Sequence, residues 1–137
     1  MDELILSIAI TWIIVKMMKT WIIWRRGDRI DLKVLFYDGG MPSAHTALVA
    51  STATALYLER GAVSTVFVLS VILALIVMND AMKVRKVTEE QSKVINRLTK
   101  GKKDYPKLDE HVGHTPVEVL VGLILGIIIP IIIYAII

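Results

Sequence analysis

Long apolar runs are the sequence feature that most constrains how this chain can fold. The chain contains four of them, at residues 4–24, 44–58, 62–78 and 115–137. An α-helix rises about 1.5 Å per residue, so about 20 apolar residues cross the roughly 30 Å hydrocarbon core of a bilayer. Hydrophobic residues make up 55% of the 137 residues, which is typical of membrane proteins rather than of soluble domains. We therefore predict an all-α, integral-membrane helical bundle with about four transmembrane helices, forming a single domain over residues 1–137.

The distribution of basic residues predicts the orientation of this bundle. Lys and Arg are concentrated in the connections at residues 25–41 and 79–113. The positive-inside rule places both connections in the cytoplasm, so four spans leave both termini outside the cell membrane. Residues 83–98 are expected to form a short cytoplasmic helix, and the basic stretch 83–107 a solvated face attracted to anionic lipid. The net charge of +3 thus reports membrane orientation, and we expect no nucleic-acid partner.

A turn followed by a helix start lies at residues 39–47, which read G-G-M-P-S-A-H-T-A. Ser43 is a good N-cap, and His45 falls in the first turn of the helix that follows. A helix N-terminus has unpaired N–H groups and the positive end of the helix dipole, so His45 is predicted to stand beside an anion site. The alternative is that these residues only cap a helix. The same helix carries Ala47, Ser51 and Ala55 at four-residue spacing, which predicts a central place in the bundle.

The start of the last apolar run has a second set of helix-start signals. Thr115 and Glu118 match a capping box, with Pro116 at the first helical position and His114 directly before it. Gly122 and Gly126 form a GxxxG pattern that predicts close helix packing. By the orientation above, this helix and the one that carries His45 begin on the same cytoplasmic face.

Charged residues inside the first apolar run need an explanation. Lys16 and Lys19 interrupt it, and a lysine near the bilayer centre costs roughly 2.5–3.5 kcal/mol. Each is therefore expected to face protein or water. For Lys19 the alternative is that its long side chain reaches the membrane interface, because it lies close to Arg25.

Three separated stretches together resemble the motifs of a known family. They are Lys19 with Arg26, P-S-A-H at residues 42–45, and G-H-T-P-V-E-V at residues 113–119. In this order they are similar to the motifs of the type-2 phosphatidic acid phosphatase superfamily, which also contains vanadium-dependent haloperoxidases. The fuller pattern, which resembles the small divergent branch of that superfamily over nearly the whole chain, adds residues 39–41, Asp80, Val84, Arg85, Gln91 and residues 94–96.

The chain departs from the family pattern in several places. Gly27 stands where the family has proline, and Arg29 competes with Arg26, although the seven-residue spacing from Lys19 favours Arg26. Leu108 stands where the family has an arginine ahead of the histidine, and Arg85 is the candidate to supply that charge. Glu118 replaces an aspartate but keeps the carboxylate. The chain also has fewer spans than the usual six of the superfamily, which leaves room for a homodimer.

The resemblance implies a mechanism and its residues. His114 would be the nucleophile that forms a phosphohistidine, Glu118 would orient its ring, and His45 would protonate the leaving oxygen. Lys19, Arg26, Arg85 and the N–H groups that follow Ser43 would bind the phosphoryl oxygens. No metal and no other cofactor is needed. The implied substrate is a lipid phosphate monoester or an isoprenoid diphosphate at the cytoplasmic leaflet, and a haloperoxidase role is not expected for so short and apolar a chain.

Two alternatives stand beside this reading, and the role of Asp80 is also open. A non-catalytic membrane protein could keep the same fold to bind anionic lipid head groups. His111 and His114 could belong to a metal site with Asp104, Asp109 or Glu110, which we rank below the phosphatase because further ligands at helical spacing are missing. Asp80 is expected either to pair with Lys83 or to orient an active-site base.

Overall fold

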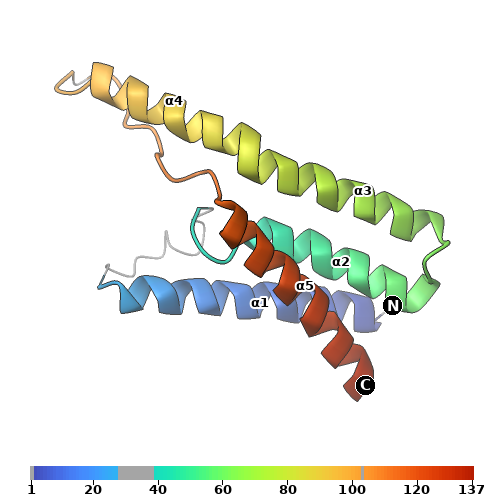
Figure 1. Ribbon diagram of the computed structural model, residues 1–137. Helices are drawn as coiled ribbons and strands as arrows, with labels where there is room; N and C mark the ends of the chain where they lie inside the picture. The colour runs from blue at the N-terminus through green and yellow to red at the C-terminus, as the bar shows by residue number, and fades with distance from the viewer. Residues whose placement is uncertain (1, 28–38, 103) are drawn as a thin grey trace.

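The computed structural model describes residues 2–27, 39–102 and 104–137, and within these ranges every regular element is helical (Figure 1). The elements are α1 (Asp2–Arg25), α2 (Ala44–Arg60), α3 (Thr65–Asn79), the π-helical segment η2 (Asp80–Val84), α4 (Arg85–Leu98) and α5 (Pro116–Ile136). The predicted all-helical class is thereby confirmed.

Helix α2 lies at the centre of the bundle. It packs against α1, α3 and α5, and α1 also contacts α5 (Figure 1). The buried side chains of α2 are all small, namely Thr46, Ala47, Ala50, Ser51, Ala53 and Ala55. Small side chains let neighbouring helix backbones approach closely, which is why this helix can be surrounded on several sides. The central position predicted from its four-residue spacing is confirmed.

The closest of these packings joins α2 to α5. A Cβ atom added at Gly122 would lie 2.5 Å from the carbonyl oxygen of Ser43, and one added at Gly126 would lie 2.6 Å from that of Ala47. No side chain fits at such distances, so α5 can approach the start of α2 only because both positions are glycine. The predicted GxxxG packing surface is confirmed.

Three helical segments are long and apolar enough to cross a membrane, judged by length and composition: Glu3–Arg25, Thr65–Leu98 and Pro116–Ile136. The fourth helix of the bundle, α2, has 17 residues and is less apolar. The expected count of about four spans therefore separates into three apolar helices and a shorter one packed among them. Because its neighbours cover it, α2 needs little apolar surface of its own.

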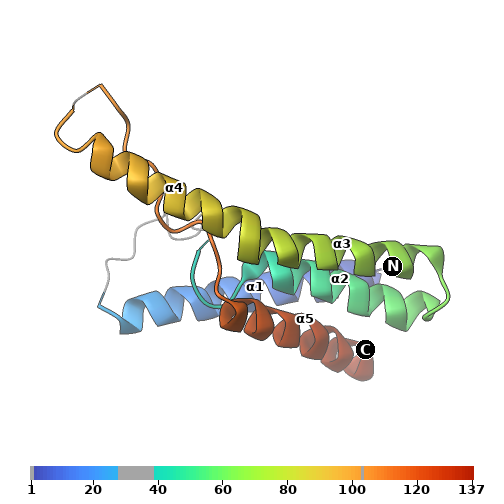
Figure 2. The same ribbon diagram turned by 45° about the horizontal axis from the view of Figure 1, so that its top comes forward.

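Helices α3 and α4 form one continuous helix through η2. The sequence predicted an apolar span from residue 62 and a separate basic helix, whereas the span begins at Thr65, after a turn whose Ser64 caps it by accepting the Phe67 N–H at 3.3 Å. Neither proline nor glycine interrupts the chain from there to residue 98. The polar half, α4, projects beyond the other helices in both views, and the following loop returns to the start of α5 (Figures 1 and 2).

Candidate functional site

The starts of α2 and α5 lie side by side. The backbone N–H of Ser43 donates to the carbonyl oxygen of Glu118 at 3.1 Å. The Ser43 hydroxyl caps α2 by accepting the Thr46 N–H at 3.5 Å, and the predicted Thr115–Glu118 capping box is present at α5. The positive ends of two helix dipoles therefore meet at one end of the bundle. This places His45, which is half-buried in the first turn of α2, at the same end as His114.

His114, directly before α5, is buried and held by two hydrogen bonds. Its side chain is buried, its backbone N–H donates to the Ala81 carbonyl oxygen at 3.1 Å, and its Nδ1 lies 3.2 Å from Oε2 of Glu118. The same Oε2 accepts the Thr115 N–H at 3.0 Å, so Glu118 caps the helix and orients the imidazole at once. Within the part of the chain that the structure describes, the buried Nε2 of His114 has no hydrogen-bond partner.

Electrostatics favour the neutral form of this ring. The pKa of His114 is held below its ordinary value of 6.5; burial is the largest cause, and the positive charges of Lys19 and Arg85 also lower the pKa, whereas Glu118 raises it. At neutral pH the ring is therefore mostly uncharged. With Nδ1–H donating to the Glu118 carboxylate, the lone pair is left on Nε2.

A cleft of about 440 Å³ lies beside His114 and is lined from four parts of the chain. These are the end of α1, the 39–41 turn, the start of α4, and a fourth part made of His111, Gly113, Thr115 and Glu118. Its charged lining residues are Lys19, Arg26, Lys86, Glu89 and Glu118, and His111 lines it as well. Ile22 and Ile23 supply an apolar wall. Three cations and an apolar wall in one cleft suit a phosphate group attached to a lipid.

The glycine pair of the 39–41 turn is needed for this geometry. Gly40 has a φ of 84°, which side chains rarely adopt, and a Cβ there would lie 3.9 Å from Cε of Lys19. A Cβ at Gly39 would collide with the carbonyl group of His111. The turn can thus lie between α1 and the 111–118 segment only with glycine at these positions.

The structure brings Lys19 and Arg26 into the cleft together. Lys19 is 2% exposed, and Arg26 is exposed at the end of α1. Helix α1 persists to Arg25, so the seven-residue spacing keeps both cations on one side. The competing candidate, Arg29, lies outside the described residues.

Arg85, Ser43 and His45 are not among the residues that line the cleft, and neither is His114, whose side chain is buried behind its neighbours Gly113 and Thr115. The Nε of Arg85 lies 2.7 Å from Oδ2 of Asp80, and its charge still acts on His114 as described above. The expected pairing of Asp80 with Lys83 is wrong, because Asp80 pairs with Arg85. The wider turn of η2 brings position 85, five residues on, over Asp80 instead.

Two cleft residues were missed from the sequence, Lys86 and Glu89. Glu89 is 6% exposed, and its Oε1 pairs with Lys86 at 2.8 Å and with Lys93 at 2.6 Å. Its Oε2 accepts the Gly113 N–H at 3.2 Å, next to His114. The sequence signal that could have found them is the spacing of Lys86, Glu89 and Lys93, which puts the three charges on one face of the predicted helix.

The alternative of a metal site finds no ligand set. No group of three or more His, Cys, Asp or Glu side chains that could hold a metal ion occurs in residues 2–27, 39–102 and 104–137. His111 is exposed, and its Nδ1 lies 3.9 Å from the Asp109 carboxylate. His114 instead has Glu118 as its neighbour.

Comparisons with known proteins identify the family of the chain. The family described as the Divergent PAP2 family matches residues 1–129. The uncharacterized membrane protein YuiD of Bacillus subtilis (strain 168) is 38% identical over 115 residues, which cover 72% of this chain and 73% of that protein. No solved structure matches the chain. The helical membrane bundle and the family match over nearly all of its length show that the chain belongs to the divergent PAP2 family.

Proposed function

We propose that this membrane protein is a phosphatase that hydrolyses a lipid phosphate monoester or an isoprenoid diphosphate through a phosphohistidine at His114. The observation that carries the proposal is the buried imidazole beside a cationic cleft, with Nδ1 against Glu118 and Nε2 without a partner among the described residues. A histidine nucleophile needs a neutral ring, a fixed tautomer and a lone pair that no other group holds. The lowered pKa of His114, its contact with Glu118 and its unpartnered Nε2 among the described residues support these three needs.

The proposed reaction has two steps. The Nε2 lone pair of His114 attacks phosphorus, the bond from phosphorus to the lipid oxygen breaks, and His45 gives a proton to that oxygen. Water then attacks the phosphohistidine and loses a proton to His45, the P–N bond breaks, and inorganic phosphate leaves. Both histidines return to their starting states, so no metal, oxidant or other co-reactant is required.

The cations of the site have a separate role in this scheme. Lys19, Arg26 and Lys86 in the cleft are proposed to bind the phosphoryl oxygens, with Arg85 and the N–H groups after Ser43 adding positive potential nearby. Lys86 is the cation that the family pattern did not suggest. It lies close to the 113–115 segment, because a Cβ at Gly113 would be 2.8 Å from Cα of Lys86.

The membrane position of the cleft is proposed from α1. Trp21 and Trp24 are 56% and 61% exposed on the same helix end whose Ile22 and Ile23 line the cleft. The Arg25 guanidinium lies 5.2 Å from the centre of the Trp21 ring. Exposed tryptophan and arginine are typical of the membrane interface. We place the cleft at the cytoplasmic interface, with both termini outside, so that a lipid phosphate enters from the leaflet with its chain along the isoleucines.

Phosphate release by the purified full chain tests the proposal. The substrates are phosphatidic acid, a long-chain monophosphate and an isoprenoid diphosphate, presented in neutral-lipid nanodiscs. The variant is His114→Ala, and the matched control is Tyr134→Phe, which removes a hydroxyl bonded to Glu59 at the other end of α5. We expect the alanine variant to lose about a thousandfold or more of the activity and the control to keep it. Activity that survives in His114→Ala would remove the proposed nucleophile.

A second candidate function is binding of anionic lipid head groups without turnover. The observation in its favour is the pairing of Arg85 with Asp80, because this arginine was expected to replace the one missing from the family motif. The same samples distinguish the two functions. Lipid phosphate that binds the wild type with no release of inorganic phosphate and no acid-labile phosphohistidine supports the binding protein.

A further inference from the structure

A second charged cavity, of about 730 Å³, lies at the far end of α4. It is lined by six charged side chains, Lys93, Arg97, Lys100, Lys102, Lys107 and Glu110, and we call it the basic cup. It shares no lining residue with the cleft beside His114. The family motifs, the comparisons and the proposed phosphatase reaction assign no role to it.

The two walls of the basic cup are fastened together by Asn96. Its Nδ2 donates to the Leu108 carbonyl oxygen at 2.9 Å and to Oε1 of Glu110 at 2.7 Å, and its Oδ1 accepts the Leu108 N–H at 2.9 Å. These bonds hold the returning loop against the last turns of α4. The cations of the loop and those of the helix therefore border one cavity rather than lying on an open surface.

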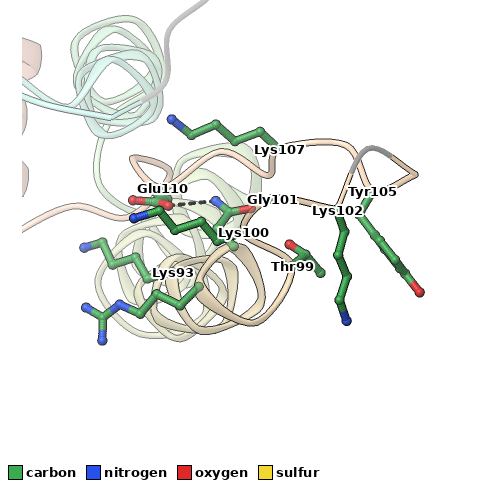
Figure 3. A pocket seen from close by; sticks show the side chains of 10 residues that line it. Lys93, Thr99, Lys100, Gly101, Lys102, Tyr105, Lys107 and Glu110 are labelled. Carbon is green, nitrogen blue, oxygen red and sulfur yellow. Dashed lines mark hydrogen bonds between the residues drawn. The ribbon is translucent and has the colours of Figure 1, made fainter.

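Positive charge in the basic cup greatly exceeds negative charge. Glu110 is the one carboxylate among the residues that line it, and it already accepts the hydrogen bond from Asn96. Lys93 pairs with Glu89, but Arg97, Lys100 and Lys107 form no ion pair with any described residue. Figure 3 shows the ends of Lys93, Lys100 and Lys107 on the side of Glu110, whereas Lys102 and Tyr105 point the other way. An anion bound in the cup would offset the mutual repulsion of these cations.

The basic cup stands away from the membrane. His114, beside the cleft, bonds to Ala81, and Asn96 follows Ala81 on one continuous helix, roughly 20 Å further along at about 1.5 Å per residue. The polar headgroup layer adds only about 5–8 Å to each side of the hydrocarbon core. With the cleft at the interface, as proposed above, the cup lies beyond the reach of head groups in its own bilayer.

We propose that the basic cup binds a soluble anion that carries several phosphate groups. Several cations around one cavity match several linked phosphates better than a single phosphate, because each phosphate can take its own lysine or arginine. The distance of the cavity from the bilayer favours a soluble ligand over a lipid head group. The site is independent of turnover at His114.

Titration calorimetry with inorganic tripolyphosphate tests this proposal on the full chain in phosphatidylcholine nanodiscs. We expect one equivalent to bind, with an affinity that falls as salt is raised. The variant combines Lys100→Gln with Lys107→Gln. Both lysine side chains are exposed, and replacing them removes no described hydrogen bond. We expect it to bind about tenfold more weakly. Lys83→Gln, an exposed lysine outside both cavities, is the matched charge control and should change affinity by less than about twofold.

Four results would overturn the proposal. One is the absence of tripolyphosphate binding to the wild type, and another is equal binding by the double variant. The third is competition by anionic lipid, seen as lost tripolyphosphate binding in phosphatidylserine nanodiscs, which would make the head group the ligand. His114→Ala should bind tripolyphosphate as the wild type does. Loss of binding in that variant would place the anion in the cleft, whatever the outcome of the phosphatase test.

Discussion

The cleft and the basic cup both gather positive charge, but they hold it in different ways. Lys19 lines the cleft and His114 lies beside it; each is 2% exposed, and Glu118 fixes the imidazole from one side. In the cup, Lys100, Lys102 and Lys107 are exposed at the end of a projecting helix. Buried charges act strongly and in one geometry, whereas exposed charges are screened and move. The first arrangement suits chemistry on a phosphoryl group, and the second suits binding alone.

Glu89 connects the two regions. Its carboxylate pairs with Lys86, which lines the cleft, and with Lys93, which lines the cup, and it also accepts the Gly113 N–H beside His114. The same helix face thus carries cations for both cavities. This connection makes it possible to perturb one region while reading out the other.

The largest expected difference is in the rate of phosphate release, between variants of a buried lysine and of a partly exposed lysine of α1. Lys19→Met should lower phosphate release about 100-fold, because the cleft loses a desolvated cation. Lys16→Met is the matched control, since Lys16 lies outside the cleft with its Nζ 5.7 Å from the Trp12 ring centre, and it should keep the activity. Initial rates with the best lipid phosphate measure both variants. Equal losses in the two would show that α1 tolerates neither change and that burial in the cleft is not what matters.

The next effect concerns the packing on which the cleft depends. Gly126→Ala should destabilise the bundle by about 1–3 kcal/mol, because its Cβ would lie 2.6 Å from both the Ala47 carbonyl oxygen and the Ala50 Cβ. Leu120→Ala, at a side chain 53% exposed on the same helix, should stay within about 0.5 kcal/mol of the wild type. Unfolding by sodium dodecyl sulfate in mixed micelles measures the free energies. An unchanged stability of Gly126→Ala would contradict the close α2–α5 contact.

A smaller effect is expected for the residue that joins the regions. Glu89→Gln loses the charge that pairs two lysines but keeps a group that can accept the Gly113 N–H. We expect kcat to fall about tenfold with a smaller change in KM, because Lys86 and the segment before His114 are held less firmly. Glu89→Asp should recover part of kcat. A fall in yield or stability alone, with kcat unchanged in the folded fraction, would reduce Glu89 to a structural role.

The smallest effect is a shift along the pH axis. Because the pKa of His114 lies below 6.5, phosphate release should fall on the acid side, with a midpoint below 6.5 as the ring gains a proton. Glu118→Gln removes a group that raises this pKa, so the acid limb should move to still lower pH while the rate falls. Initial rates of both proteins measured from pH 5 to pH 8 test the direction in which the acid limb moves. A limb that moves upward would contradict the proposed neutral nucleophile.

Local features of the site were predictable from the sequence. The Thr115–Glu118 capping box, the Ser43 N-cap and the Gly122–Gly126 surface all appeared as expected, because each depends on neighbours within one or two turns of a helix. The placement of Lys19 and Arg26 on one side of α1 also followed from their spacing, since α1 continues almost to Arg26. Such features need only the helical repeat.

Features that depend on how the helices meet were not predictable. The π-helical turn of η2 gave Asp80 a different partner, and it sets the rotation of α4 relative to α3. Lys86 and Glu89 reach the cleft only because α4 packs on Gly113. No local pattern announces a contact between segments so far apart in the chain.

The sequence by itself determined that this protein is a bundle of apolar helices with two capped helix starts, because hydrophobic runs, small residues and caps act over short distances. Only the tertiary structure decided which charges share the cleft, which share the cup, and that His114 is buried with one ring nitrogen on Glu118. Those outcomes depend on desolvation and on distances between separate helices. Packing of the whole chain sets both.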